Sequence, residues 1–260
     1  MSEASLKNAN VNGHRIAYQE LGEGDALVFV HGMGGAPPHG ANFPGRLALH
    51  RRVILPSLPG WDDSEAGEYQ THEELADALA PFLREVAGER YDLVAESAGS
   101  PVALWLAINH PESVEKLVLV GPPVLGPAHR PAFGSTEELL QMLYGDAPDW
   151  SEPPSEADEA RRARNTAANV QRFRSPEATQ TLLSRLPDVK AQTLLLWGTE
   201  DRISPPDMGA AYRKLIPNAY RIYVHGAAHS LPIAAGQRFA ELTIDFLERG
   251  EFFVVNAGKD

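Results

Sequence analysis

Short apolar runs recur along the chain, and each of them ends at glycine, proline or serine. In chain order they are DALVFVHG from Asp25, RRVILPS from Arg51, YDLVAES from Tyr91, EKLVLVG from Glu115, QTLLLWG from Gln192 and YRIYVHG from Tyr220. Because these runs are apolar on both faces, they predict the buried strands of a parallel sheet. Helical patterns lie between most of them, and one begins at Thr71 with Glu74 three residues later, as in a capping box. Strands that alternate with helices predict an α/β fold with right-handed crossovers.

Two regions depart from this alternation. Asn12 and Gly13 form an Asn-Gly turn between two short candidate strands, which predicts an antiparallel hairpin at the edge of the sheet. Farther along, about 70 residues run from Gly121 to Lys190, whereas a strand-helix-strand crossover usually takes about 30. We therefore expect residues 122–190 to be an inserted helical cap over the carboxyl edge of the sheet, where open parallel sheets bind ligands. Residues 1–121 and 191–260 then form the core. The alternative is a surface excursion without a role at the site.

Composition and charge narrow the classes of function. The chain has 260 residues, no cysteine and a formal net charge of -12. The lack of cysteine excludes disulfides, thiolate metal sites and a cysteine nucleophile. The acidic balance argues against nucleic acid as a partner. No apolar run approaches the roughly 18 residues of a membrane helix, and no secretory signal pattern opens the sequence. We expect a cytoplasmic monomer or homodimer that acts on a small molecule, without a membrane partner.

The segment YDLVAESAGS, from Tyr91 to Ser100, places a serine among small residues at the end of an apolar strand. One interpretation makes Ser97 the N-cap of the following helix, accepting a hydrogen bond from a free backbone amide. The other makes it the nucleophile of a strand-turn-helix elbow, with its hydroxyl exposed at the top of the sheet. A serine nucleophile needs a base, a group that orients the base, and donors for the oxyanion.

The base and the acid can be chosen by position. Among the nine histidines, His229 lies in a loop just after the last strand candidate, which brings it to the same sheet edge as Ser97. The segment GTEDRISP places Glu200 and Asp201 after the preceding strand, on that edge as well. A buried carboxylate there could accept the ring hydrogen of His229 and fix its tautomer. Of the two acids we choose Asp201.

The oxyanion donors are expected to be backbone amides. One is the amide of Ala98, the residue after the nucleophile, and the other comes from the glycine-rich segment HGMGG, as the amide of Met33 or its neighbour Gly34. The same segment lacks the spacing and the lysine of nucleotide-binding loops. We expect neither a metal nor an organic cofactor.

Five segments together resemble the alpha/beta-hydrolase superfamily: HGMGG, VILPSLPGWDDS, AESAG, GTEDRISP and GAAHS. They span most of the chain apart from the insertion, and the order Ser97, Asp201, His229 is the order of that superfamily. The resemblance implies an alpha/beta-hydrolase fold, with a mostly parallel eight-stranded sheet flanked by helices and an inserted helical cap. It also implies Ser97 as nucleophile, Asp201 as acid and His229 as base, with the oxyanion held by the amides of Met33 and Ala98.

Some positions depart from the superfamily pattern. Ala95 replaces the usual first glycine of the elbow, and Ala228 replaces the glycine that often precedes the histidine. Ser57 takes the place of a common aspartate. That change to Ser57 can alter loop packing or the pocket entrance, and Asp62 and Asp63 lie where members often have a glycine.

The serine nucleophile limits the branches of the superfamily that the chain resembles. Haloalkane dehalogenases and epoxide hydrolases use an aspartate at the elbow, so the sequence is closer to small carboxylesterases and carbon-carbon bond hydrolases. We expect a serine hydrolase that acts through an acyl-enzyme on a small or medium carboxylic ester, lactone or thioester. The alternatives are a carbon-carbon bond hydrolase of a diketone from aromatic degradation and a non-hydrolytic lyase or oxygenase. In the carbon-carbon branch an aromatic residue often follows the histidine, whereas this chain has Ser230.

The insertion also contributes candidate substrate contacts. In the carbon-carbon branch an arginine of the cap often serves the site, and such a side chain could bind a substrate carboxylate. The candidates are Arg130, Arg161, Arg162, Arg164, Arg172 and Arg174. The apolar candidates for the pocket lining are Met33, Trp61, Leu125 and Phe173.

Overall fold

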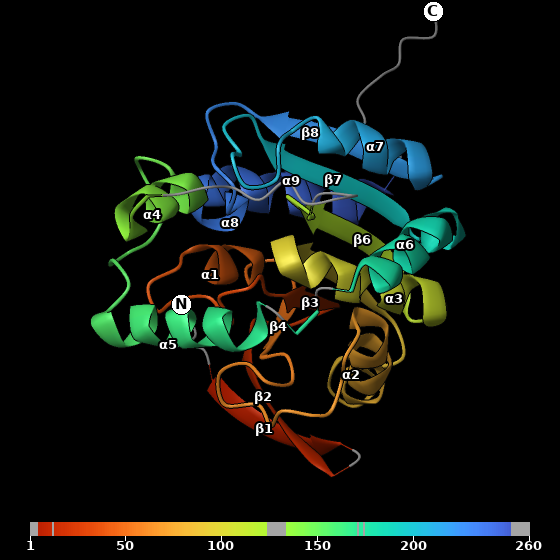
Figure 1. The fold of residues 1–260 in the computed structure, drawn as a ribbon. Helices are drawn as coiled ribbons and strands as arrows, with labels where there is room; N and C mark the ends of the chain where they lie inside the picture. The colour runs from red at the N-terminus through yellow and green to blue at the C-terminus, as the bar shows by residue number, and fades with distance from the viewer. Residues whose placement is uncertain (1–4, 12, 124–133, 171, 174, 251–260) are drawn as a thin grey trace, which may run out of the picture.

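An eight-stranded sheet forms the centre of the molecule (Figure 1). The structure is a computed structural model that describes residues 5–11, 13–123, 134–170, 172–173 and 175–250. The strands are β1 (Ser5–Val11), β2 (His14–Leu21), β3 (Ala26–Val30), β4 (Arg52–Pro56), β5 (Tyr91–Glu96), β6 (Val114–Val120), β7 (Gln192–Gly198) and β8 (Ala219–Val224). Their order in the sheet is β1-β2-β4-β3-β5-β6-β7-β8. β1 and β2 pair antiparallel at one edge and β2 pairs antiparallel with β4, whereas the other neighbours are parallel. The predicted mostly parallel fold and its edge hairpin are confirmed.

The register of the parallel strands aligns their carboxyl ends. Val30 of β3 lies opposite Ala95 of β5, and Val120 of β6 lies between Glu96 of β5 and Leu196 of β7. Consequently the loops that follow these strands emerge next to one another at one edge of the sheet. Ser97, Asp201 and His229, which the sequence analysis chose as nucleophile, acid and base, follow strands at that edge.

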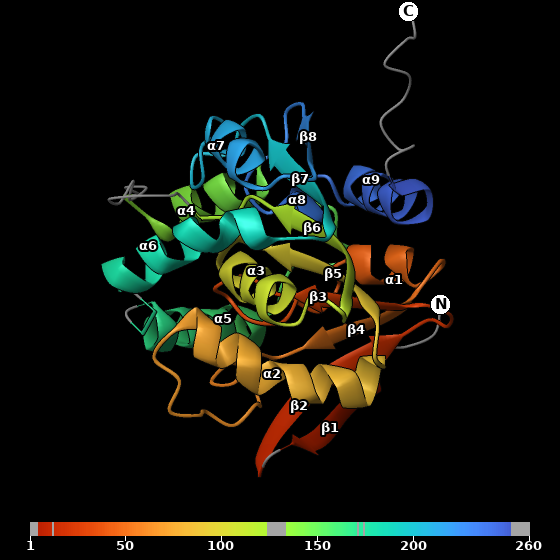
Figure 2. The same ribbon diagram turned by 90° about the vertical axis from the view of Figure 1, so that its right-hand side faces the viewer.

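Helices cover both faces of the sheet (Figure 2). One face carries α2 (His72–Ala87), α3 (Ser100–Asn109) and α7 (Met208–Leu215), which bury side chains in one apolar core. The other carries α1 (Phe43–Leu47), α8 (Leu231–Ala234) and α9 (Gly236–Arg249), which share a second core. α2 begins with the predicted capping box between Thr71 and Glu74. α3 is buried on nearly all sides, which fits its uniformly apolar sequence.

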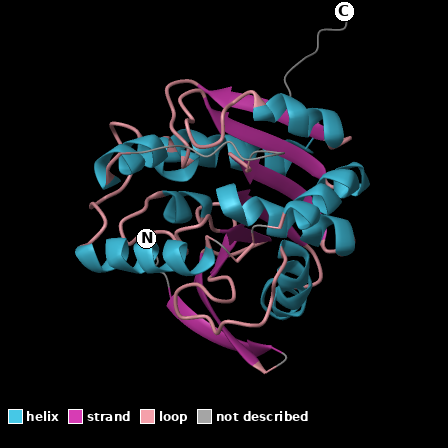
Figure 3. Cartoon of the chain, viewed as in Figure 1, coloured by secondary structure: helices cyan, strands magenta, loops and turns pink. Residues whose placement is uncertain are grey.

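Three further helices, α4 (Thr136–Tyr144), α5 (Glu156–Asn169) and α6 (Pro176–Arg185), follow β6 and precede β7 along the chain. Figure 3 colours the helices of the described residues differently from the strands. The segments STEELLQMLYG and SEADEARRARNTAANVQRF have helical patterns that coincide with α4 and α5, whereas no such pattern marks α6. Ser175 caps α6 and Pro176 occupies its first turn, which is a common start signal that the sequence does contain. The cap boundary at residues 122–190 stays a prediction. Among the helices that the structure describes, none is long and apolar enough to cross a membrane.

Candidate active site

Ser97 lies at a sharp turn between β5 and α3. It is the first residue of η1 (Ser97–Gly99), a single 3-10 turn, and its φ of 48° is in the left-handed region that side chains rarely adopt. The turn packs closely against β3, because a Cβ atom on Gly99 would lie 2.4 Å from the carbonyl oxygen of His31. Gly99, not Ser97, precedes α3 as its N-cap. The N-cap interpretation of Ser97 is therefore wrong, and the backbone has the form of a nucleophile elbow.

The structure brings Ser97, His229 and Asp201 together in one hydrogen-bonded chain. The Nε2 atom of His229 lies 2.8 Å from the Oγ atom of Ser97. The Nδ1 atom of the same ring lies 2.8 Å from the Oδ2 atom of Asp201. The side chains of His229 and Asp201 are 3% and 0% exposed, so water does not compete for their contact. Glu200, the other candidate acid, is exposed.

The hydrogen bonds of Asp201 bear on which ring nitrogen of His229 carries a hydrogen. Its Oδ1 atom accepts hydrogen bonds from the backbone amides of Ile203 at 2.9 Å and Ser204 at 2.7 Å. Two amide donors thus occupy Oδ1, and Oδ2 is the oxygen that faces Nδ1 of His229. The Nδ1 atom of His229 must then carry the hydrogen, which leaves the lone pair of Nε2 to accept the hydroxyl hydrogen of Ser97. This arrangement permits proton transfer from Ser97 to His229.

Glycines allow the loops that carry the acid and the histidine to pack on each other. A Cβ atom on Gly198 would lie 2.1 Å from the carbonyl oxygen of Ala227. Gly121, at the end of β6, has a φ of 49°, and a Cβ atom there would lie 3.1 Å from Oδ2 of Asp201 and 3.2 Å from Nδ1 of His229. The contact between acid and base thus depends on the absence of side chains at two strand ends.

Helix α4 supports the histidine loop with its last backbone carbonyls. The amide of His229 donates to the carbonyl of Met142 at 3.3 Å, and the amide of Ser230 donates to the carbonyl of Leu143 at 2.7 Å. The last four carbonyls of a helix have no partner within it, so they are free to accept such bonds. The sequence analysis did not foresee this contact, because backbone atoms contribute no residue-type signal.

The loop of residues 32–36 lies beside Ser97 and contains the first of the predicted oxyanion donors. A Cβ atom on Gly32 would lie 3.4 Å from the Cβ atom of Ser97. Within the described part of the chain, the backbone amides of Met33 and Gly34 donate no hydrogen bond. The carbonyl of Met33, in contrast, accepts a hydrogen bond of 2.9 Å from Nε1 of Trp61. Ala98, the second predicted donor, follows Ser97 directly in η1.

The side chains of Glu96 and Ser230 flank the Ser97 and His229 pair, and the sequence analysis gave neither of them a role at the site. Glu96 directly precedes Ser97 and accepts a hydrogen bond from the hydroxyl of Ser230, which directly follows His229. Nearby, Arg162 of α5 donates to the hydroxyl of Tyr144 at 2.9 Å. Burial raises the pKa of Tyr144, although the charge of Arg162 opposes the rise. The charges of Glu96 and Arg162 thus act on Tyr144 in opposite directions.

The other candidates of the sequence analysis fall into separate groups. Arg161 and Arg162 contact the 32–36 loop, Arg172 donates to backbone carbonyls including that of Tyr69, and Arg164 is exposed. Trp61 stacks on Phe173, with ring centroids 5.9 Å apart and an interplanar angle of 8°. Leu125, Arg130 and Arg174 lie outside the described residues.

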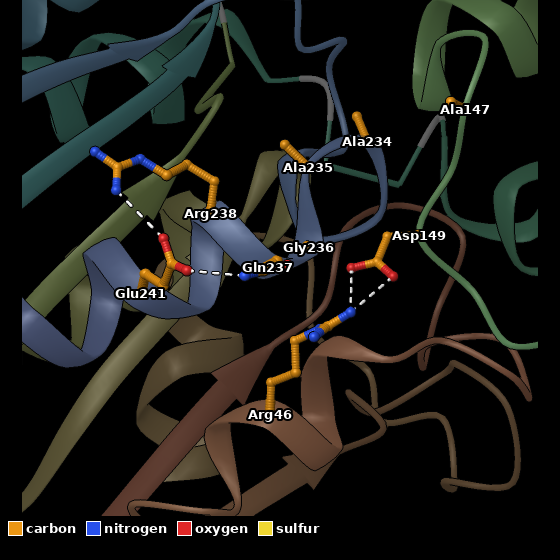
Figure 4. A pocket seen from close by; sticks show the side chains of 9 residues that line it. All are labelled: Arg46, Ala147, Asp149, Ala234, Ala235, Gly236, Gln237, Arg238 and Glu241. Atoms are coloured by element: carbon orange, nitrogen blue, oxygen red, sulfur yellow. Dashed lines mark hydrogen bonds and ion pairs between the residues drawn. The ribbon is translucent and has the colours of Figure 1, made fainter.

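A hollow of about 400 Å³ lies between α1 and the start of α9 (Figure 4). Its charged side chains already pair with one another: Arg46 with Asp149 at 3.0 Å, and Arg238 with Glu241 at 3.3 Å. The residues that line this hollow do not include Ser97, His229 or Asp201. The candidate active site is therefore the group of Ser97, His229 and Asp201, whose hydrogen-bond geometry permits proton transfer. In the described residues no group of three or more histidine and acidic side chains could hold a metal ion.

Comparisons with known proteins agree with the fold. The model of the family described as "Alpha/beta hydrolase family" matches residues 27–242. The 2-hydroxymuconate semialdehyde hydrolase of Pseudomonas putida is 31% identical to the chain, over 92% of each protein. The 2-hydroxy-6-oxo-6-phenylhexa-2,4-dienoate hydrolase of Comamonas testosteroni is 28% identical, over 95% of this chain and 96% of the relative.

Solved structures show the same architecture. A complex of the meta-cleavage product hydrolase from Pseudomonas fluorescens IP01 with acetates superposes with a TM-score of 0.73, at 20% identity, over 93% of this chain and 97% of that one. The family model covers most of the chain, including the elbow, the acid loop and the histidine loop. The chain is therefore a member of the alpha/beta hydrolase family, as its sequence motifs indicated.

Proposed function

We propose that the protein is a serine hydrolase that cleaves a carbon-carbon bond next to a ketone in a ring-fission product of aromatic degradation. The observation that carries the hydrolytic part is the continuous chain from Ser97 through His229 to Asp201, with 2.8 Å at each contact. Support for the substrate class comes from the relatives, which are hydrolases of a dienoate and of a muconate semialdehyde. Their similarity extends over more than nine-tenths of this chain.

Each residue has a role in this proposal. His229 takes the proton of Ser97 as the serine oxygen attacks the ketone carbonyl, while Asp201 stabilises the imidazolium that forms. The amides of Met33 and Ala98 hold the oxyanion. In the keto tautomer of the substrate the carbon-carbon bond then breaks, and its electron pair passes into the adjoining conjugated enone as a dienolate, which takes the proton from His229. Water activated by His229 finally releases the acyl group from Ser97.

Arg162 is the residue we propose for the carboxylate of such a substrate. Its guanidinium lies against the 32–36 loop, since a Cβ atom on Gly34 would lie 2.7 Å from its Nη2 atom. It donates to Tyr144 and to the carbonyl of Ala36, and its five N–H groups allow further bonds to a carboxylate. Arg162 belongs to the insertion, so the insertion would act as a cap that contributes to substrate binding.

Hydrolysis of a small or medium ester, lactone or thioester is the second candidate. The observation that favours it is the pair of Glu96 and Ser230, which places a carboxylate immediately beside Ser97. That charge repels an anionic substrate but not a neutral ester. The triad chemistry is the same for both candidates, because each forms an acyl-enzyme and releases an acid.

One experiment separates these candidates. Purified wild-type protein and the Ser97→Ala variant are assayed against ring-fission dienoates, p-nitrophenyl esters, lactones and thioesters, and are labelled with a fluorophosphonate. We expect turnover of a dienoate and labelling of the wild-type protein, both lost in Ser97→Ala. Turnover of esters alone would establish the second candidate. If neither reaction nor labelling depends on Ser97, the serine-hydrolase proposal is wrong and a lyase or oxygenase on this fold becomes the explanation.

A further inference from the structure

Helix α5 is unusual because it docks on the protein almost without apolar contacts. Its sequence, EADEARRARNTAAN, contains no large apolar side chain, and its buried residues are Asn165 and Asn169. Asparagine is mostly exposed in proteins, and buried amides need hydrogen-bond partners. The position of α5 must therefore be set by polar contacts with the segments beneath it.

Those contacts lead to the carbonyl groups of the 32–36 loop. Nδ2 of Asn165 donates to the carbonyl of Gly34 at 3.0 Å. Arg161 and Arg162 both donate to the carbonyl of Ala36 at 3.3 Å. Trp61 likewise donates to the carbonyl of Met33. The carbonyls of the loop are thus held by side chains from other parts of the chain. The amides of Met33 and Gly34 have no acceptor among the described residues, so they remain available to donate.

Asp62 connects the same loop to α5 from the other side. Its carboxylate is 7% exposed and accepts from the amide of Ala36 at 2.8 Å, from Ser57 at 3.0 Å, from Asn165 at 2.7 Å and from Arg161. The backbone amide of Asp62 in turn donates to Oδ1 of Asn165 at 3.2 Å. Burial acts to raise the pKa of Asp62, but its hydrogen bonds and the neighbouring positive charges hold it below the ordinary value.

The local backbone shows that this position is specialised. Asp62 has a φ of 49°, in the left-handed region where glycine is the usual residue and aspartate is among the few others tolerated. Gly35 of the loop approaches so closely that a Cβ atom would lie 2.3 Å from Nδ2 of Asn165 and 2.7 Å from Oδ1 of Asp62. The turn accepts backbone strain in order to place a carboxylate between the loop and α5.

We propose that Asp62, Asn165 and Arg161 are positioning residues that hold the 32–36 loop with its carbonyls turned back and the amide of Met33 aimed at the reacting carbonyl. This inference rests on the proposed function, because it assigns the loop to the oxyanion. A rotated peptide in the loop would present a carbonyl oxygen to the developing negative charge and repel it. The contacts with α5 prevent that rotation, so the insertion takes part in catalysis through the loop that it contacts.

The test measures how fast Ser97 is phosphonylated by a fluorophosphonate, a reaction that also develops negative charge on oxygen. We compare Asp62→Asn with Asp63→Asn, since Asp63 is exposed, and Arg161→Met with Arg164→Met, since Arg164 is exposed on the same helix. Asn165→Ala provides an independent variant. The maximal labelling rate and the half-saturating probe concentration are determined separately, with circular dichroism and thermal unfolding as checks of folding.

We expect Asp62→Asn, Asn165→Ala and Arg161→Met to lower the maximal rate by roughly 10- to 100-fold, less than the loss of a whole oxyanion donor. The half-saturating concentration should change by less than about twofold, because the ground state does not use the oxyanion donors. Asp63→Asn and Arg164→Met should label like the wild type.

If Asp62→Asn does not fold, Asn165→Ala and Arg161→Met decide the question. Folded variants that label at the wild-type rate overturn the positioning role alone. A wild-type protein that does not label at all overturns the proposed function, and the positioning role with it.

Discussion

The Nε2 atom of His229 lies 2.8 Å from the Oγ atom of Ser97, although 132 positions separate the two residues in the chain. The contact arises because both residues follow strands of one parallel sheet and emerge at its carboxyl edge. Asp201 follows a third strand of that sheet and completes the chain of hydrogen bonds from the far side of the ring. The sheet thus brings three distant segments into one chain of hydrogen bonds.

Removing the charge of Asp201 should slow the chemical step without unfolding the protein. In Asp201→Asn the Nδ1 atom of His229 loses the carboxylate that accepts its hydrogen, so the ring can adopt the tautomer with its hydrogen on Nε2. That tautomer cannot take the proton of Ser97. We expect kcat to fall by about 1,000- to 10,000-fold, as measured by steady-state kinetics on the substrate found by the panel.

Glu200→Gln is the matched control for that variant. Glu200 adjoins Asp201 in the same loop but is exposed, and its carboxylate contacts only Thr199, at 3.5 Å, within the described residues. The activity of Glu200→Gln should stay within about twofold of the wild type, because the charge of an exposed side chain is screened by solvent. The reverse pattern, with full activity in Asp201→Asn and loss in Glu200→Gln, would show that the acid was assigned to the wrong residue.

Gly121→Ala should disturb the acid and base directly. The new Cβ atom would lie 3.1 Å from Asp201 and 3.2 Å from His229, and the φ of 49° adds backbone strain. Gly226→Ala has the same kind of strain, at a φ of 72°, but its Cβ atom would meet no atom within 4 Å. Both variants should lose about 1 kcal/mol of unfolding free energy from the strained backbone.

Only Gly121→Ala should also lose activity, by roughly 10-fold or more, because a displacement of the pair by a few tenths of an ångström weakens both hydrogen bonds. Urea unfolding and steady-state kinetics on the two variants separate strain from contact. Equal kcat values in the two variants would show that the Asp201 and His229 pair tolerates the added methyl group, contrary to this reasoning.

The motifs that carry chemistry could be predicted from sequence because each follows a strand with a clear apolar pattern. Ser97, Asp201 and His229 are placed by β5, β7 and β8, whose boundaries the apolar runs indicate to within a few residues. In a parallel sheet, knowing where a strand ends is nearly enough to know which edge its loop occupies. Helix α6 was not predicted because its sequence signals are local caps rather than a strong apolar period.

The contacts between distant loops could not be read in the same way. The sequence indicated that Asp62 lies at a position where glycine is common, but the meaning of that substitution depends on Asn165, which is 103 residues away. Its bond to Ser57 also connects two departures from the superfamily pattern, with the carboxylate at one position and a hydroxyl at the other. The hydrogen bonds between α4 and the histidine loop involve only backbone atoms, so no residue type in the sequence indicates them.

Glu96→Gln should change selectivity between the two proposed substrate classes. The neutral amide keeps an oxygen that can accept the hydrogen bond from Ser230 and removes the negative charge beside Ser97. An anionic dienoate then no longer meets a like charge, which at the effective dielectric of a protein surface is worth on the order of 1 kcal/mol or more. We expect the ratio of kcat/KM for a dienoate to that for a neutral p-nitrophenyl ester to rise about 5- to 10-fold.

Glu85→Gln, an exposed position on α2, serves as the control for a change of net charge and should leave this ratio unaltered. The ratio is the decisive quantity, because a general loss of activity cancels in it. An unchanged ratio in Glu96→Gln would mean that the carboxylate does not face the substrate.

Asp92 lies at the start of β5, at the end of the strand opposite Ser97, and makes the stability of the protein depend on pH. Its Oδ1 atom is buried without a hydrogen-bond partner among the described residues, and its Oδ2 atom lies 3.9 Å from Nε of Arg51. Burial raises its pKa to about 6, against the opposing charges of Lys116 and Arg51. The folded protein therefore binds this proton more tightly than the unfolded chain does.

The sign of the effect follows from that difference. The stabilisation from protonated Asp92 is fully present below pH 3.8, the unfolded value, and is lost as the pH rises through about 6. Asp92→Asn stays neutral at all pH values, so its unfolding free energy relative to the wild type should increase by about 2 to 3 kcal/mol between pH 4 and pH 8. Urea titrations at pH 4, 6 and 8 measure this difference, and Asp25→Asn, at an exposed position, should show almost none. A difference that does not change with pH would mean that Asp92 is ionised in the folded protein throughout this range, with Arg51 and Lys116 compensating for its burial.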